Sequence, residues 1–260
     1  MPETKFRSFR VDAVVLRHSD YGEADRLLTM YTRQLGKTRA LAKGARKIAS
    51  RKAGHIEPFT YVKLQLAKGR DMFIVTQADT VDAYLPLRED LILTSQAAYV
   101  MELLDRLTYE NDTENTATFR LLTDTLSRLA SNAGASSPLS VWLVIRYYEM
   151  RLLDYMGFRP QLLECANCGR EILAEDQYFS FTAGGVICPR CGQGLPNLRN
   201  ISVDTLKYLR HFQRSSYAEA SRARPSPEIQ QEAEALMQGY FTYLLERELN
   251  TPGFLKKIKQ

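Results

Sequence analysis

The sequence has no long apolar segment, which argues against a membrane protein. No stretch approaches the roughly 18 consecutive apolar residues that a transmembrane helix requires. The polar residues 1–10 also lack the apolar core of a secretory signal. We therefore expect a cytoplasmic protein without membrane contact. Its 260 residues, 45% of them hydrophobic, suffice for two or three small globular domains.

Catalytic motifs are missing as well. Gly36, Lys37 and Thr38 resemble the end of a phosphate-binding loop, but Tyr31 stands where that loop needs a glycine. The sequence has only three histidines and no Gly-x-Ser-x-Gly motif, and neither cysteine pair is preceded by the proline of the zinc deaminase signature. We therefore expect no enzymatic activity. A divalent-dependent nuclease is the enzymatic alternative, because acidic nuclease sites need no compact motif.

The four cysteines form two pairs with the spacing of metal ligands. Cys165 and Cys168 are separated from Cys188 and Cys191 by 19 residues. Two residues between thiolates let both sulfurs of one turn face a single ion, and the glycine after each pair permits a tight backbone turn. Four sulfurs fill a tetrahedral shell, so we predict one structural zinc ion. A redox CxxC site is the weaker alternative, since neither pair opens an evident βαβ unit.

Charge is distributed unevenly, although the net charge is only +5. Residues 1–80 have 16 Lys/Arg against 8 Asp/Glu, residues 81–164 have 7 against 12, and residues 165–260 have 12 against 10. A basic first third suggests a polyanionic partner, and the acidic middle third suggests a different one.

Seven cations fall within residues 37–52, a segment without Asp or Glu. Small residues and two glycines in 42–54 predict a flexible loop, and a cationic loop of this kind neutralises nucleic-acid phosphates with an affinity that falls as salt rises. Tyr61, on the same strand face as Lys63, is the aromatic residue that we most expect to be exposed for base stacking. The predicted nucleic-acid contacts are Lys37, Arg39, Lys43, Arg46, Lys47, Arg51, Lys52 and Tyr61.

The first 80 residues predict a small β-barrel. Runs typical of strands occur at 9–17, 27–32, 37–42, 59–67 and 72–78, separated by turn-forming residues. In 59–67, Val62, Leu64 and Leu66 face one way, and Tyr61, Lys63 and Gln65 face the other. Five short strands suit an OB-fold, whose loops and strand face line a nucleic-acid groove.

After Pro86 the hydrophobic period becomes helical. We expect helices at 90–108, 116–130, 138–156, 202–212 and 225–249. A hydroxyl cap at Ser136 or Ser137 and Pro138 should start the third, and Gly157 should end it. The prediction is thus an α+β chain: a five-stranded OB-fold barrel at 1–80, a helical bundle domain at 81–164 and 196–260, and an inserted four-cysteine zinc element at 165–195. The basic tail 256–260 should be frayed.

Several short strings of the chain are characteristic of one protein family. The N-terminal strings are Val14-Val15-Leu16-Arg17, Tyr21-Gly22-Glu23-Ala24-Asp25-Arg26-Leu27-Leu28, Leu35-Gly36-Lys37, Ala42-Lys43-Gly44-Ala45-Arg46 and Pro58-Phe59. A further string, Tyr155-Met156-Gly157-Phe158-Arg159-Pro160, stands just before the first cysteine pair. With these strings the chain resembles the RecO family of recombination mediators, and the resemblance covers most of the chain. Within these strings, we expect Glu23 and Asp25 to pair with local basic groups or to fix a turn rather than to bind metal.

The resemblance implies a DNA repair protein. Its implied activities are binding of single- and double-stranded DNA, annealing of complementary strands and help in loading recombinase onto coated single strands in RecF-type recombination. Its implied partners are RecR and the C-terminal tail of the single-strand-binding protein, at the nucleoid, and no short motif here assigns the tail-binding residues. A protein-interaction adaptor without DNA activity is the alternative, supported by the acidic middle third and the apolar helix at 138–156.

Overall fold

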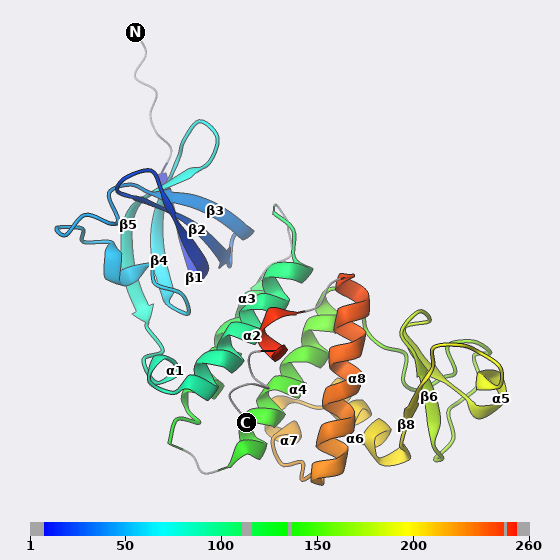
Figure 1. Cartoon of the computed structure of the whole chain (residues 1–260). Helices are drawn as coiled ribbons and strands as arrows, with labels where there is room; N and C mark the ends of the chain where they lie inside the picture. Colours follow the sequence, from blue (N-terminus) through cyan, green and yellow to red (C-terminus); the bar gives the residue numbers. More distant parts are fainter. Residues whose placement is uncertain (1–7, 111–115, 135–136, 247–248, 254–260) are drawn as a thin grey trace. The chain divides into compact units, whose positions relative to one another are not determined.

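The chain, seen in a computed structural model that describes residues 8–110, 116–134, 137–246 and 249–253, forms two compact units (Figure 1). The first comprises Met1–Ala133 and Thr251–Gln260, and the second comprises Gly134–Asn250. The helices are therefore shared between the two units, whereas the sequence analysis placed them in one helical domain. The predicted domain boundaries stay a prediction.

The first unit begins with a closed five-stranded barrel. Its strands are β1 (Ser8–Tyr21), β2 (Asp25–Thr32), β3 (Gly36–Ala42), β4 (Tyr61–Lys68) and β5 (Phe73–Asp82), in the order β1-β2-β3-β5-β4. Strand β1 pairs with both β4 and β2, and β3 and β5 run parallel. β1 extends beyond the predicted 9–17, because it pairs with β4 over residues 8–14 and with β2 over residues 13–21. A bulge interrupts the pairing with β2 between Val15 and Arg17. The predicted OB-type barrel is confirmed.

Alternation along the strands fills the barrel interior. Val62, Leu64 and Leu66 of β4 are fully buried, as predicted, and belong to one apolar cluster with side chains from all five strands. The same cluster takes in Ala45 and Ile56, which come from the connection between β3 and β4. The core thus anchors both ends of the basic segment.

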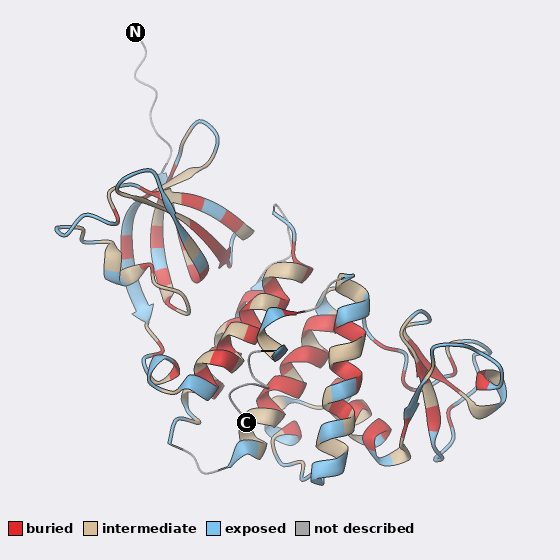
Figure 2. Ribbon diagram, in the orientation of Figure 1, coloured by how far each residue is buried: buried red, intermediate tan, exposed pale blue. Residues whose placement is uncertain are grey.

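Three helices follow the barrel in this unit: α1 (Pro86–Glu89), α2 (Leu91–Leu107) and α3 (Thr116–Ala130). The Asp90 carboxylate caps α2 by accepting hydrogen bonds from the amides of Ile92 and Leu93, at 2.8 and 3.0 Å. Helix α2 contacts β1 and α3, and Figure 2 shows buried residues along both helices. At the other end of the chain, Thr251 donates to the Glu102 carboxylate of α2 through its amide (2.9 Å) and hydroxyl (2.6 Å).

The second unit is built on α4 (Pro138–Tyr155), α6 (Val203–Arg214), α7 (Tyr217–Ala220) and α8 (Pro227–Leu245). Helix α4 contacts the other three, so its predicted central place holds within this unit. Ser137 is its N-cap residue but makes no side-chain cap bond, and Ser136 lies outside the described residues. At the other end Gly157 has φ +77°, and the Phe158 amide closes the turn on the Leu153 carbonyl at 2.8 Å, as a glycine terminator does.

The cysteine segment adds a small sheet to the second unit. Strands β6 (Gln177–Ser180), β7 (Gly185–Ile187) and β8 (Arg199–Ile201) pair in the order β7-β6-β8, and α5 (Pro189–Gly192) is a single turn. The sequence prediction missed these short strands. Helix α8 ends at Leu245 rather than 249, and the basic tail 256–260 lies outside the described residues. Among the helices that the structure describes, none is both long and apolar enough to cross a membrane.

Candidate nucleic-acid interface and metal centre

The four cysteine sulfurs converge on one point of the second unit. All four Sγ atoms lie within 4.8 Å of one another, and the sulfurs of Cys168 and Cys188 are 4.0 Å apart. A tetrahedral zinc with Zn–S bonds of about 2.3 Å separates its sulfurs by about 3.8 Å. The predicted pairs therefore meet as the two halves of one tetrathiolate cluster, and all four cysteines are free of disulfides.

Backbone amides favour thiolates in this cluster. The Cys188 amide donates to Cys165 Sγ at 3.3 Å. Burial acts to raise the pKa of Cys165, but amides of Cys188, Cys168 and Asn167 outweigh it and lower the pKa to about 6. At Cys191 the Asn167 side chain acts to lower the pKa, but the thiols of Cys188 and Cys168 raise it to about 11. A cation between the sulfurs would offset the repulsion between neighbouring thiolates, so the donor set fits a zinc ion.

The two glycines that follow the pairs serve different purposes. Gly169 has φ +69°, a conformation that favours glycine, and its amide returns to the Cys165 carbonyl at 2.8 Å. Gly192 has no such φ, but a Cβ there would lie 2.3 Å from Cδ2 of Tyr178. The predicted backbone curl thus holds at Gly169 but not at Gly192, where close packing against Tyr178 is what requires glycine. A filled four-sulfur shell would join these turns and leave no position for a substrate.

The basic segment between β3 and β4 is tied down where it leaves β3. The Asp25 carboxylate accepts a hydrogen bond from the Gly44 amide at 2.7 Å. The Arg46 guanidinium pairs with Asp20 at 3.2 Å and donates to the carbonyls of Gly22 and Glu23. Asp25 therefore fixes a turn, as predicted, and Arg46 serves as an anchor to the turn between β1 and β2.

A second set of contacts holds the segment where it returns to β4. The Glu57 carboxylate pairs with Arg26 at 2.6 Å and lies 3.2 Å from His18 Nε2. Partial burial acts to raise the pKa of Glu57, but these two side chains outweigh it and lower the pKa. Between the two ends, the 3-10 turn η1 (Ala53–His55) brings His55 Nδ1 within 2.7 Å of the Thr80 hydroxyl. The segment is therefore an anchored loop rather than the flexible one we expected.

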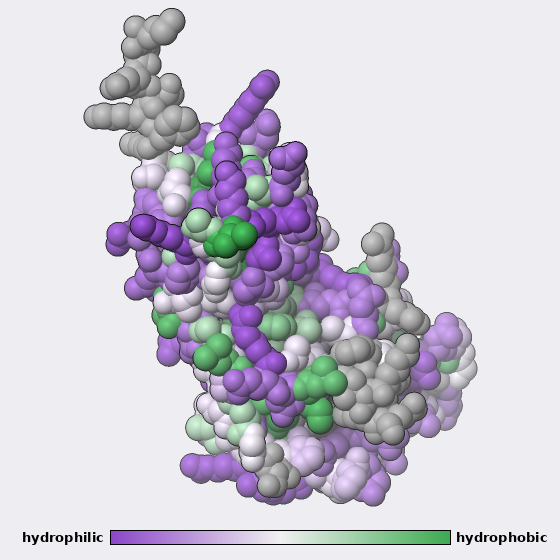
Figure 3. Space-filling view, turned by 60° about the vertical axis from the view of Figure 1, so that its left-hand side comes forward, coloured by the Kyte–Doolittle hydropathy of each residue, from purple (hydrophilic) through white to green (hydrophobic). Residues whose placement is uncertain are grey.

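Three of the predicted cations remain available on this loop. The side chains of Lys43, Lys47 and Arg51 are exposed and have no ion-pair or hydrogen-bond partner among the described residues. Lys52 differs, because its ammonium donates to the Val75 carbonyl at 3.2 Å and burial lowers its pKa despite the nearby Asp25. On the face that Figure 3 presents, the barrel side chains are mainly hydrophilic, with small hydrophobic areas between them.

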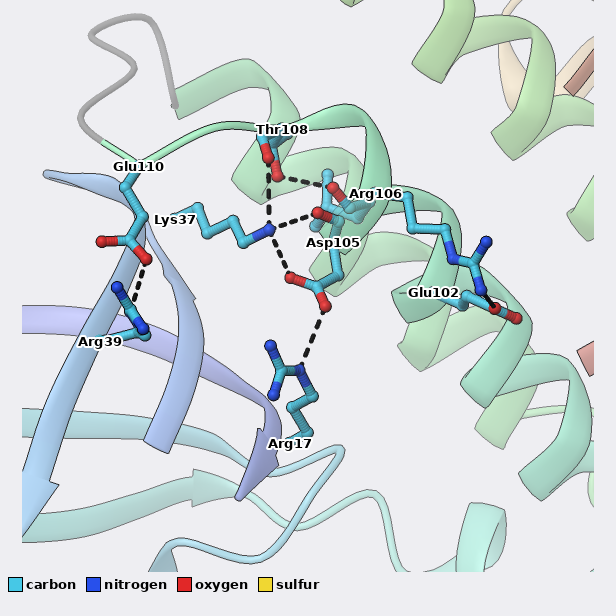
Figure 4. Close-up of polar contacts among 9 residues, drawn as sticks. Arg17, Lys37, Arg39, Glu102, Asp105, Arg106, Thr108 and Glu110 are labelled. Carbon is cyan, nitrogen blue, oxygen red and sulfur yellow. Dashed lines mark hydrogen bonds and ion pairs between the residues drawn. The ribbon is translucent and has the colours of Figure 1, made fainter. Parts of the chain in front are cut away.

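Lys37 and Arg39 make ion pairs within the protein that the sequence analysis did not predict. The Lys37 ammonium pairs with the Asp105 carboxylate of α2 at 2.6 Å and donates to the carbonyls of Asp105 and Thr108 (Figure 4). Arg39 pairs with Glu110 at 2.6 Å, and Arg17 of β1 shares Asp105 at 3.2 Å. These ion pairs join the barrel to the last turn of α2 and to the segment just after it, and we call them the α2 seam.

Tyr61 is half-buried rather than exposed. Its ring packs edge-on against Phe119 of α3 with centroids 5.6 Å apart, and its hydroxyl donates to Asp12 at 3.4 Å. The outer face of β4 at this point is covered by a helix, which alternation within the strand could not reveal. Of the eight predicted contacts, the structure thus brings Lys43, Lys47 and Arg51 together on one exposed loop and gives the others partners within the protein.

The histidines form no metal or nucleophile site. His18 lies against Glu57, His55 against Thr80, and His211 Nδ1 within 2.9 Å of the Ser215 hydroxyl. Within the described ranges, the only group of three or more potential metal-binding side chains close enough to share an ion is the cysteine cluster. The candidate sites are therefore a cationic loop and a structural metal cluster.

Comparison with known proteins identifies the family of the chain. Residues 6–84 match the family model "Recombination protein O N terminal", and residues 88–252 match "Recombination protein O C terminal". The chain is 42% identical over 255 residues to a DNA repair protein RecO of Roseiflexus sp., covering 98% of this chain and 87% of the relative. It is 36% identical over 248 residues to the DNA repair protein RecO of Dehalococcoides mccartyi strain 195, covering 94% of each chain. The chain therefore belongs to the RecO family of DNA repair proteins.

Proposed function

We propose that this protein binds single- and double-stranded DNA through its anchored basic loop, anneals complementary strands and assists the loading of recombinase onto single-stranded DNA. The observation that carries the proposal is the exposed group Lys43, Lys47 and Arg51 on a loop fixed at both ends of an OB-type barrel. Cations held in place in this way neutralise phosphates at a smaller entropic cost than mobile ones.

Annealing needs no catalytic group in this proposal. Two DNA strands repel each other, and a cationic surface reduces that repulsion while it leaves the base edges free to pair. Contacts to phosphate carry no sequence information, so binding should depend little on sequence. The zinc ion would hold the second unit together and would take no part in DNA chemistry.

The partners belong to the same proposal. We expect RecR and the C-terminal tail of the single-strand-binding protein to bind this chain, in the cytoplasm at the nucleoid. We expect these partners because the chain belongs to the family, not because of a contact in the structure. No described residue is assigned to either of them.

Strand annealing without nucleotide tests the proposal. Complementary fluorescent oligonucleotides should anneal faster with the protein, and a Lys43→Ala, Lys47→Ala, Arg51→Ala triple variant should lose most of that acceleration. Arg33→Ala is a matched control, because Arg33 is an exposed barrel cation that pairs with Asp12 and lies outside the loop. Equal acceleration by the triple variant would mean that the loop is not the DNA site, and magnesium-dependent cleavage of the strands would favour the nuclease alternative.

An adaptor role is the second candidate, and an exposed apolar group favours it. This group lies around the junction of α1 and α2 and consists of Leu85, Leu91 and Ile92, each roughly half exposed. The acidic residues Glu89 and Asp90 lie next to it in the sequence. Apolar side chains in such a setting are typical of protein contacts. A Leu91→Ser, Ile92→Ser variant that loses partner capture while DNA binding stays intact would assign partner binding to this group.

A further inference from the structure

The anchored basic loop exposes one large apolar side chain. Ile48 has a relative exposure of 108%, the highest among the exposed large hydrophobic residues that the structure describes, whereas Ile56 of the same loop is fully buried in the barrel core. Residues 43–58 contain no Phe, Tyr or Trp. Ile48 is therefore the large apolar group that this loop presents to a ligand.

The charges beside Ile48 define what kind of ligand would meet it. Lys47 precedes it directly and Arg51 follows three residues later, both exposed and without a partner among the described residues. Single exposed aliphatic residues are common and need no function. An aliphatic tip between two available cations, on a loop fixed by Arg46 and Glu57 at its ends, is a more specific arrangement.

We propose that Ile48 inserts between neighbouring bases of single-stranded DNA while Lys47 and Arg51 hold the adjoining phosphates. This inference rests on the proposed function, since it requires DNA on the loop. Inserted apolar side chains are an established way for proteins to separate stacked bases, and isoleucine is among the residues used. Unstacking is harder within a paired duplex than in a single strand, so Ile48 favours single strands over duplex.

Ile48→Ala tests the insertion with the full-length, zinc-loaded protein. Its affinity for a single-stranded oligonucleotide should fall about tenfold, and its affinity for duplex less than about twofold, because only the base contact is lost. Ile48→Met keeps an insertable side chain and should bind as the wild type does. The salt dependence should be unchanged in both variants, since no phosphate contact is removed.

A fluorescent base reports insertion independently of affinity. An oligonucleotide that contains 2-aminopurine brightens when its bases unstack, so wild type should raise its emission at saturation and Ile48→Ala should not. Leu173→Ala, which removes an exposed leucine of the second unit, is the matched control and should behave as wild type.

Two further comparisons separate the failure of this inference from the failure of the proposed function. If Lys47→Ala weakens single-strand and duplex binding alike while Ile48→Ala changes neither affinity nor emission, DNA binds the loop and the insertion is wrong. If wild type binds neither oligonucleotide in dilute salt, the proposed function fails and this inference fails with it. Because Ile48 is so exposed, Ile48→Ala should unfold at the same temperature as wild type. This control would show that a loss of single-strand affinity in the variant is not caused by misfolding.

Discussion

Replacing Lys37 by methionine should destabilise the first unit and leave DNA binding almost unchanged. The Lys37 side chain is only 16% exposed and that of Asp105 21%, and the ammonium also satisfies two carbonyls at the end of α2. Methionine keeps the aliphatic stem but removes the charge and all three contacts.

The structure sets the size of this effect. Removing one partner of a fully buried ion pair costs about 3–5 kcal/mol. The α2 seam is partly accessible, and Asp105 keeps Arg17 at 3.2 Å, so a loss of about 2–3 kcal/mol is expected. The carbonyls of Asp105 and Thr108 would also lose a cation at the negative end of a helix.

Arg39→Met provides the matched control on the same strand. Arg39 also pairs with an acidic residue beyond the barrel, but its side chain is 53% exposed and that of Glu110 is 41% exposed. Such a pair contributes about 0–1 kcal/mol. Urea unfolding followed by circular dichroism should therefore separate the two variants clearly.

For DNA affinity, in contrast to stability, Lys37 should matter less than an exposed cation of the loop. Lys37→Met should bind oligonucleotides within about twofold of wild type, whereas Lys47→Met, which would remove a proposed phosphate contact, should lose about five- to tenfold at 0.1 M salt. If Lys37→Met unfolds like wild type yet binds DNA weakly and with a reduced salt slope, Lys37 contacts phosphate and our reading of the α2 seam is wrong.

Three further perturbations test other parts of the structure. Cys168→Ser should reduce bound zinc from one ion per chain to none and lower the unfolding temperature of the second unit while the barrel keeps its own, as metal analysis and calorimetry would show; retained zinc would contradict the tetrathiolate cluster. Arg146 is almost fully buried and pairs with Glu149 at 2.8 Å. Glu149→Gln should destabilise the second unit by about 3 kcal/mol, because the charge of Arg146 would then have no counter-ion. A loss of stability below about 1 kcal/mol would show that the pair is not held away from water. Arg26 and His18 lower the pKa of Glu57 in the folded protein. The ionised Glu57 should therefore stabilise the fold above its unfolded pKa of about 4.3, and this stabilisation should be lost as pH falls through the lower folded pKa. Wild type and Glu57→Gln should differ in unfolding free energy at neutral pH and converge in acid.

Local sequence patterns predicted the barrel well and its surroundings poorly. Val62, Leu64 and Leu66 alternate as a half-buried strand requires, and this local signal identified the inward face of β4. The burial of Tyr61 depends on Phe119, nearly 60 residues later in the chain, and no local pattern reports such a contact. The cysteine cluster was predictable because the spacing of each pair is itself the geometry of the site.

The basic segment shows the same distinction within one site. Its seven cations were evident from the sequence, but a count of like charges does not say which of them the fold uses internally. The acidic partner of Lys37 comes from the last turn of α2, and that of Arg39 comes from the segment just after α2. Arg46 pairs with Asp20 beside the turn before β2. Only the pairing of distant segments separates these structural cations from Lys43, Lys47 and Arg51.

If Lys43, Lys47 and Arg51 contact DNA phosphates, the salt dependence of DNA binding must report it. Binding of duplex DNA should be followed from 0.02 to 0.3 M salt, a range of about one decade, for wild type and the triple alanine variant. We predict that the slope of log K against log salt becomes shallower by about three, close to 0.9 for each cation removed. Parallel lines for the two proteins would show that these side chains touch no phosphate and that the proposed DNA site is wrong.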